Sequence, residues 1–259
     1  MRLDHPDTHL FVLTGAGVSA ESGIPTFRGS GGVWNGESVA RVASLSGFVH
    51  DPARVWRFYS ERRAAASAKP NAAHYALAEV ERRLGDRMLL VTQNIDGLHA
   101  AAGSTQLLEL HGNLFKSRCS RCEREPFDDA ASYEAQRLPA CGRCHARGEF
   151  ALLRPHVVWF GERIARADLE RIEAFMRRAS TSKHFVFLAA GTSGLVAPSA
   201  QLVDAARSLG ADTWLVNADT PANAASFHHV VLGNASTELP KLLALPASGA
   251  GRAAGDAHL

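Results

Sequence analysis

The sequence predicts an α/β fold in which a Rossmann-like, doubly wound parallel sheet carries a smaller lobe. Short apolar segments alternate with segments of helical periodicity over most of the 259 residues, as in parallel sheets covered by helices on both faces. Two stretches, near residues 36–70 and 115–155, interrupt this alternation and would form the smaller lobe. With 46% hydrophobic and 21% charged residues, the chain has enough apolar material for a substantial core.

Five segments are expected to form buried parallel strands, because strands covered on both faces are apolar throughout rather than alternating. They are residues 10–14, 88–92, 185–190, 213–217 and 229–232.

Helices are expected between these strands. One is opened by Asp51, an N-cap followed by proline, and runs towards residue 67. Another covers residues 71–84 and stops at a glycine, a third is capped by Asp168, and a fourth covers residues 198–209.

The pattern divides the chain into one large domain, two insertions and a tail. The Rossmann-like domain would comprise residues 1–35, 76–114 and 156–246, with a helical insertion at 36–75 and a cysteine-bearing module at 115–155. Residues 247–259 are rich in alanine and glycine and are expected to be disordered.

The charge and hydropathy give no indication of nucleic-acid or membrane binding. The net charge is only +2, and no apolar run approaches the roughly 20 residues of a membrane span. The apolar residues 10–20 do not suit a signal peptide, since Asp4 and Asp7 precede them and glycines interrupt them. We therefore expect a cytoplasmic, monomeric protein with reduced thiols.

A glycine-rich turn follows the first predicted strand directly. It reads Gly15-Ala16-Gly17-Val18-Ser19-Ala20, and glycines here let backbone N–H groups approach a pyrophosphate. A tight turn in any α/β protein could give the same pattern. A dehydrogenase would also place an acidic residue about 20 positions further on, after a second strand. Instead, residues 22–34 form a Gly/Ser-rich loop that ends at Trp34, so a dinucleotide would be held differently, under a loop that closes as a lid.

All four cysteines fall into two pairs with zinc-ribbon spacing. Cys119 and Cys122 are followed, after 18 intervening residues, by Cys141 and Cys144. Four thiolates complete a tetrahedral shell, which predicts one structural zinc ion. Two disulfides are the alternative, and His145 could replace one thiolate. The smaller lobe is thus expected to combine a zinc ribbon with the helical insertion.

Small or polar residues follow four of the predicted strands, where parallel sheets bind ligands. Residues 93–96 follow the second strand, and His111 lies shortly after them. Gly191-Thr192-Ser193 follow the third strand and Asn217 ends the fourth, while the glycine-rich turn follows the first.

These segments together resemble the sirtuin family. Residues 15–29 (GAGVSAESGIPTFRG) are similar to its cofactor loop, residues 92–99 (TQNIDGLH) to its second conserved segment, and Leu110-His111-Gly112 to the segment with its catalytic histidine. The cysteine quartet, residues 191–193 and Asn217 follow in the family's order, so that the resemblance covers about residues 8–245.

The resemblance implies that NAD is bound as a consumed co-substrate. The implied NAD-binding residues are Gly15, Ala16, Gly17, Ser19, Ala20, Phe27, Arg28, Trp34, Gln93, Asn94, Ile95, Asp96, Gly191, Thr192, Ser193, Asn217, Ala218, Asp219 and Ala235. The acyl-lysine oxygen would attack the nicotinamide ribose, and His111 would act as general base on a ribose hydroxyl. The implied products are free lysine, nicotinamide and O-acyl-ADP-ribose.

The implied partners are acyl-lysine protein substrates bound as extended peptides. The segment from Val158 to Glu162, with Phe160 and Gly161, resembles the family segment that pairs with the substrate backbone.

Tyr59 and Arg62 are three apart and share one face of the predicted insertion helix. A guanidinium and a phenol can both bind a carboxylate. The pair resembles that of the class III, desuccinylase and demalonylase-type, bacterial sirtuins, which implies removal of succinyl, malonyl and also acetyl groups. A buried tyrosine beside a solvated arginine is the structural alternative.

Other functions remain open from sequence alone. A mono-ADP-ribosyltransferase would use the same NAD site, and a deacetylase would lack the dicarboxyl-acyl preference. A Rossmann oxidoreductase is disfavoured because the acidic ribose ligand is missing. A non-enzymatic zinc-ribbon adaptor would have no use for the cofactor loop or for His111.

Overall fold

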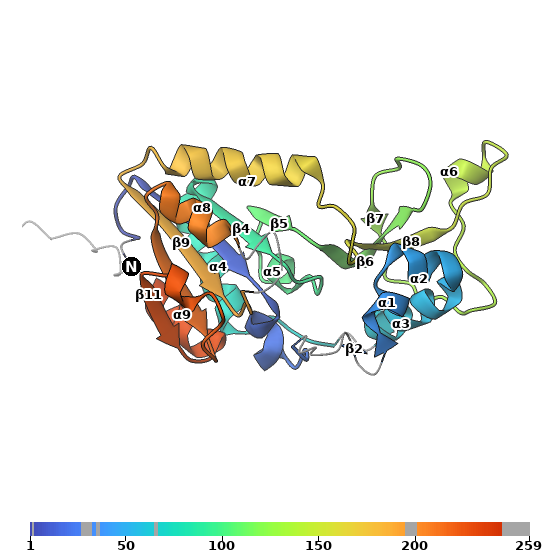
Figure 1. Ribbon diagram of the computed structural model, residues 1–259, viewed down its shortest axis with the longest axis horizontal. Helices are drawn as coiled ribbons and strands as arrows, with labels where there is room; N and C mark the ends of the chain where they lie inside the picture. Colours follow the sequence, from blue (N-terminus) through green and yellow to red (C-terminus); the bar gives the residue numbers. More distant parts are fainter. Residues whose placement is uncertain (2, 27–32, 35–36, 65–66, 195–200, 245–259) are drawn as a thin grey trace, which may run out of the picture.

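A six-stranded parallel sheet forms the body of the protein. The computed structural model describes residues 1, 3–26, 33–34, 37–64, 67–194 and 201–244. The strand order is β11-β10-β9-β1-β4-β5 (Figure 1). The strands are β1 (Thr8–Thr14), β4 (Met88–Thr92), β5 (Leu107–Glu109), β9 (His184–Ala190), β10 (Asp212–Asn217) and β11 (His229–Leu232). Because the chain winds outwards from β1 in both directions, a crevice is expected where β1 meets β9.

Helices cover both faces of this sheet, as expected for a doubly wound fold (Figure 1). Alternate residues of β1 point to opposite faces, so that Phe11 and Leu13 belong to one core cluster and Leu10 and Val12 to the other. The first cluster includes residues of α7 (Arg166–Ala179) and α8 (Leu202–Ser208). The second includes residues of α4 (Ala72–Leu84) and α9 (Ala235–Leu243).

Local sequence explains where α4 begins and ends. Asn71 and His74 form a capping box. The Asn71 side chain accepts a hydrogen bond from the backbone N–H of His74, and the His74 side chain accepts one from the backbone N–H of Asn71. At the other end, Gly85 has φ +61° and stops the helix. Shorter elements complete the large lobe, namely η1 (Ala16–Ser22), η2 (Gly85–Arg87), α5 (Leu98–Ala101) and η4 (Ala224–Ser226).

Several sequence-based expectations need correction. Asp168 does not cap α7, because the helix begins at Arg166 after Ala165 and Asp168 lies in its first turn, where an acid favours the helix dipole. Strand β11 was expected to be buried, but it is the sheet edge, and Val230 is 42% and Leu232 58% exposed. Strand β5 was not predicted. The helix expected over 198–209 is seen only from Leu202, since residues 195–200, like the tail 247–259, lie outside the described residues.

The smaller lobe joins helices from the first insertion to an antiparallel sheet from the second (Figure 1). The sheet order is β7-β6-β8. The elements are β2 (Val33–Trp34), β3 (Glu37–Ser38), α1 (Val39–Val42), α2 (Leu45–His50), α3 (Pro52–Ala64), β6 (Gly112–Cys119), β7 (Phe127–Asp128), α6 (Gly142–His145) and β8 (Leu153–Val157). Their shared core contains Trp56, Tyr59 and Trp159, together with three of the four cysteines.

Arg63 fastens α3 to this antiparallel sheet. Its guanidinium is buried and donates to the carbonyl oxygens of Leu114, at 2.8 Å, and Ala131, at 2.9 Å. It also lies 3.3 Å from the carboxylate of Asp129. A buried cation is tolerated only when it is paired and hydrogen-bonded, as Arg63 is here. The two insertions are therefore one structural unit.

The four cysteines converge at the far end of the lobe. The Sγ atoms of Cys119 and Cys144 are 3.7 Å apart, those of Cys122 and Cys141 are 3.8 Å apart, and all four lie within 4.8 Å of one another. A tetrahedral shell with Zn–S bonds of about 2.3 Å has edges of about 3.8 Å, whereas a disulfide needs about 2.05 Å. The thiols are thus positioned to bind one zinc ion, and none of them forms a disulfide.

The surroundings of the quartet also suit thiolates. The backbone N–H groups of Arg121 and Cys122 each donate to Cys119 Sγ at 3.3 Å, which stabilises negative charge on the sulfur. His145 is exposed and is not part of the cluster. The zinc-ribbon interpretation of the spacing is therefore supported with four thiolates as ligands.

Loss of the metal should destabilise the smaller lobe. We expect one zinc ion per chain by elemental analysis, and a Cys144→Ser variant with less zinc and a Tm lowered by at least about 5 °C. Emission from Trp56 and Trp159 would report unfolding of this core. His145→Ala is the matched control and should keep both its zinc and its Tm. Zinc-free protein with two disulfides by thiol titration would contradict the assignment.

Candidate functional site

A cavity of about 1690 Å³ lies at the carboxyl ends of the central strands. From the large lobe, it is lined by the segments that follow β1, β4, β9 and β10. From the smaller lobe, it is lined by residues of α3 and by residues 157–162. Large clefts at this edge of an open α/β sheet are the usual ligand sites of such folds.

Glycines allow the loops after β1 and β9 to touch. The N–H of Gly17 donates to the carbonyl oxygen of Gly191 at 2.8 Å, and a Cβ added at Gly17 would lie 2.7 Å from Gly191 Cα. A Cβ at Gly15 would meet the Gly191 oxygen, also at 2.7 Å. Gly191 itself has φ +61°, which few other residues adopt. The position of Gly15 and Gly17 after β1 predicted close approach of a pyrophosphate, and contact between the two loops is a second reason for glycine there.

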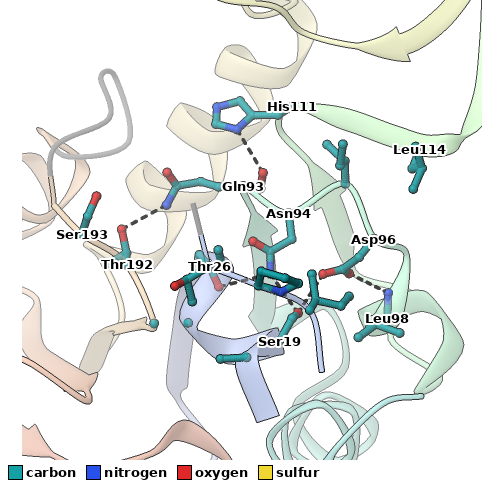
Figure 2. Close-up of a pocket in the computed structure, with 18 of the residues that line it drawn as sticks. Ser19, Thr26, Gln93, Asn94, Asp96, Leu98, His111, Leu114, Thr192 and Ser193 are labelled. Carbon is teal, nitrogen blue, oxygen red and sulfur yellow. Dashed lines mark hydrogen bonds between the residues drawn. The ribbon is translucent and has the colours of Figure 1, made fainter. Parts of the chain in front are cut away.

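Polar side chains after β4 are fixed by the loop after β1 (Figure 2). Ser19 Oγ donates to Asp96 Oδ2 at 2.7 Å, and the other oxygen of Asp96 accepts from the N–H of Leu98 at 2.9 Å. Asn94 Nδ2 donates to the carbonyl oxygen of Gly15 at 3.1 Å and to Ser19 Oγ at 3.2 Å. The amide and the carboxylate are therefore held in place at the cavity wall before any ligand binds.

A second row of polar residues, which the sequence analysis left aside, supports the first. His74 Nε2 lies 3.4 Å from Ser19 Oγ, and its ring contacts that of His99 at a centroid distance of 4.7 Å. His99 Nε2 lies 2.9 Å from Thr14 Oγ1, which donates to Thr92. Burial lowers the pKa of His99 to about 3, so this ring is neutral. In the sequence, this network was indicated by a threonine at the end of each of two predicted strands, Thr14 and Thr92.

His111 lies between β5 and β6, at the junction of the two lobes. Its Nδ1 is 3.0 Å from the carbonyl oxygen of Gln93 (Figure 2). A carbonyl only accepts, so Nδ1 carries the proton and Nε2 of the neutral ring keeps its lone pair. Burial lowers the pKa of His111, and the bond to Gln93 offsets part of that effect. The ring is thus an unprotonated base at neutral pH.

The opposite wall is built from loops after β9 and β10. Gln93 Nε2 donates to Thr192 Oγ1 at 3.3 Å and so links the two walls. Asn217, the last residue of β10, donates from Nδ2 to the carbonyl oxygen of Asp219 at 2.7 Å. The remaining predicted residues on this wall are Gly191, Ser193, Ala218 and Ala235.

Tyr59 and Arg62 of α3 line the cavity from the side of the smaller lobe. The guanidinium of Arg62 stacks on the Phe58 ring at 3.2 Å, and its Nη1 donates to the carbonyl oxygen of Phe58 at 2.8 Å. Burial lowers the pKa of Arg62 and raises that of Tyr59. A half-buried cation therefore lies beside a neutral phenol in the wall.

Residues 158–162 are held by the smaller lobe. The N–H of Val158 donates to the carbonyl oxygen of His111 at 2.9 Å, and that of Phe160 to the carbonyl oxygen of Ala43 at 3.0 Å. The Phe160 side chain is 57% exposed. The carboxylate of Glu162 accepts from Arg154 at 2.6 Å and 2.8 Å. Peptide contacts by this segment stay a prediction.

The structure brings nearly all the predicted site residues together. Within the described part of the chain, the cavity wall includes His111, the predicted substrate residues, and the predicted NAD residues from Gly15 to Ala20 and from Gln93 onwards. Phe27 and Arg28 lie outside the described residues, as does the side chain of Trp34, whose backbone belongs to β2. Trp159, which was not among the predicted site residues, also lines the cavity.

Within the part of the chain that the structure describes, none of the helices combines the length and the apolar composition that a membrane-spanning helix needs.

Known proteins resemble this chain over nearly its whole length. A model described as the Sir2 family matches residues 15–198. The NAD-dependent protein deacylase sirtuin-5, mitochondrial, of Canis lupus familiaris is 40% identical over 256 residues, covering 91% of this chain and 81% of the relative. A crystal structure of a Sir2 homologue with NAD has a TM-score of 0.78 and 38% identity, covering 91% of this chain and 88% of its own. A Sir2 complex with a p53 peptide and NAD has a TM-score of 0.73 and 27% identity, covering 91% and 92%. This chain belongs to the Sir2 family.

Proposed function

We propose that the protein removes acyl groups, namely succinyl, malonyl and also acetyl, from protein lysines while consuming NAD. The products are free lysine, nicotinamide and O-acyl-ADP-ribose. The observation that carries the proposal is one cavity whose wall includes the unprotonated His111, the loops after β1, β4, β9 and β10, and Arg62. The solved Sir2–NAD complex and the deacylase name of the canine relative support it.

The cavity residues suit a dinucleotide. Gly15, Gly17 and Gly191 let the loops after β1 and β9 lie in backbone contact, so that backbone as well as side chains lines this end of the cavity, as pyrophosphate sites require. Asn94 and Asp96 are held by Ser19 and present polar atoms on one wall, with Asn217 on the other. When bound, NAD supplies an electrophilic ribose carbon and nicotinamide as the leaving group.

His111 accepts a proton at Nε2 in the proposed reaction. The Gln93 carbonyl fixes the tautomer, so the ring needs no rearrangement before proton transfer. The buried location keeps the imidazole unprotonated, which suits a base working near neutral pH.

We further propose how the protein meets its substrates. Acyl-lysine proteins bind as extended peptides along residues 158–162, supported by the Sir2 structure that contains a p53 peptide. The protein acts as a cytoplasmic monomer without direct contact to nucleic acid. Its residues 1–35, 76–114 and 156–246 bind NAD, while 36–75 and 115–155 provide the acyl pocket and the zinc module.

The decisive experiment compares acyl groups on one peptide. Purified protein is incubated with NAD and matched acetyl-, succinyl- and malonyl-lysine peptides, and products are identified by mass. Nicotinamide with O-acyl-ADP-ribose supports the proposal. ADP-ribose attached to protein, without deacylation, would instead identify a mono-ADP-ribosyltransferase. No NAD-dependent product at all would contradict the enzymatic function.

Replacing the base should abolish turnover. We expect His111→Ala to lower kcat by at least about 100-fold, because general-base catalysis contributes roughly that much or more. The matched control, His145→Ala, changes an exposed histidine of the other lobe and should retain activity. Calorimetric titration with NAD would show whether the variant still binds the co-substrate. Activity of His111→Ala near the wild-type value would exclude the proposed role.

The pH dependence should show the lowered pKa of His111. The neutral ring is the active form, so activity is present above the folded-state pKa and is lost as the pH falls through it. Because that pKa lies below its ordinary value of 6.5, the acid limb of kcat/KM should have its midpoint below pH 6.5. Tryptophan emission over the same range controls for unfolding, since His74 and His99 also have lowered pKa values. A midpoint above pH 6.5 in folded protein would contradict this assignment.

Arg62 should determine the acyl preference. Replacing it by methionine keeps an unbranched chain but removes the cation, so kcat/KM for succinyl-lysine should fall by about 10- to 100-fold. The effect on acetyl-lysine should be several-fold smaller, because an acetyl group has no distal carboxylate. Arg57→Met, on an exposed position of the same helix, is the matched control. Equal losses for both acyl groups would indicate a deacetylase without dicarboxyl preference.

A further inference from the structure

The side chains of Tyr59 and Trp159 meet in the part of the cavity wall that the smaller lobe provides. Tyr59 comes from α3, and Trp159 comes from the segment between β8 and α7. The indole Nε1 of Trp159 lies 3.0 Å from the phenolic oxygen of Tyr59. Tyr59 is 0% and Trp159 2% exposed, yet residues 59 and 159 both line the cavity.

The chemistry of the two groups fixes the direction of this hydrogen bond. An indole N–H can only donate, so the oxygen of Tyr59 must be the acceptor. Burial raises the pKa of Tyr59, and the phenol therefore keeps its own proton. Among the described residues, no group accepts a hydrogen bond from that proton. The hydroxyl oxygen thus accepts one hydrogen bond while its proton is not donated to any acceptor in the described part of the chain, so this buried group can donate to a ligand.

The indole is packed against a cation and an aromatic ring, and its backbone is anchored. The guanidinium of Arg154 lies 3.5 Å from the centre of its ring, and the ring of Phe48 packs at 5.4 Å. The backbone N–H of Trp159 donates to Glu162 Oε2 at 2.9 Å. Glu162 is in turn bound by Arg154. The indole N–H therefore has little freedom to turn away from Tyr59.

We propose that Trp159 is a positioning residue that determines acyl specificity. By occupying a lone pair of Tyr59, its N–H directs the phenolic proton into the cavity, where Tyr59 and Arg62 together donate to the distal carboxylate of a dicarboxylic acyl group. A carboxylate offers acceptors only and so matches two converging donors. This inference rests on the function proposed above. A phenylalanine at position 159 would fill the same space without orienting the hydroxyl.

The test separates recognition of the carboxylate from catalysis. Wild type, Trp159→Phe, Tyr59→Phe and the double variant are compared with succinyl- and acetyl-lysine peptides at saturating NAD. We expect Trp159→Phe to raise KM for the succinyl peptide about tenfold, the effect of weakening one bond to a charged group, with a much smaller change in kcat. The change in KM for the acetyl peptide should be several-fold smaller.

The double variant tests whether Trp159 acts through Tyr59. In the Tyr59→Phe background, the second substitution should raise the succinyl KM no further, because the hydroxyl is already gone. Trp56→Phe is the matched control. Trp56, on α3, is buried like Trp159, but its indole N–H donates to the carbonyl oxygen of Leu153 and not to Tyr59. It should leave the ratio of succinyl to acetyl KM at the wild-type value.

Several outcomes would overturn the proposal. Additive effects of the two substitutions, or equal changes for both peptides, would mean that Trp159 only supports the fold. If Trp159→Phe does not fold, Tyr59→Phe decides alone: an unchanged succinyl KM excludes Tyr59 as a donor. Failure of the proposed function looks different, because wild-type protein would then remove neither acyl group.

Discussion

The site depends on the alignment of three neighbouring strand ends. Thr14 pairs with Thr92 on one side and with Ala190 on the other, so β1, β4 and β9 finish at the same level of the sheet. The chain must then turn three times in a small space, and the contact between Gly17 and Gly191 makes this geometrically feasible. Ser19, Asn94, Asp96 and Thr192 of the large-lobe wall are placed by these turns. A side chain at either glycine would separate the loops and displace both walls.

The two lobes contribute different halves of the chemistry. The parallel sheet presents backbone and amide groups suited to a dinucleotide, while α3 and residues 158–162 present a cation, a phenol and an exposed aromatic ring. His111 lies at the boundary, between β5 at one edge of the large sheet and β6 of the smaller antiparallel sheet. A base in that position can reach a ligand held by one lobe and a substrate held by the other. Motion between the lobes would therefore alter the reacting distance directly.

The sequence predicted the large lobe well because its strands are apolar throughout and because Asn71 and Gly85 mark the two ends of α4. β5 was missed because three residues, of which only Leu108 is buried, give no periodic pattern. β11 was expected to be buried, since an apolar composition cannot distinguish an edge strand from a central one. Arg63 and Trp159 could not be assigned roles from sequence, because the partners that define them are distant in the chain. Asp129 and Leu114 fix the first, and Tyr59 the second.

Adjacent arginines on α3 have different structural roles. Arg63 is locked into the carbonyl groups of the neighbouring sheet, whereas Arg62 faces the cavity. Substitutions at position 62 can therefore change which acyl group is bound, while Arg63 keeps the smaller lobe assembled. The side chains on the cavity-facing side of α3 can thus be exchanged while the fold of the smaller lobe stays the same. Related enzymes with other acyl preferences could arise by substitutions on one helical face, without any redesign of the dinucleotide half.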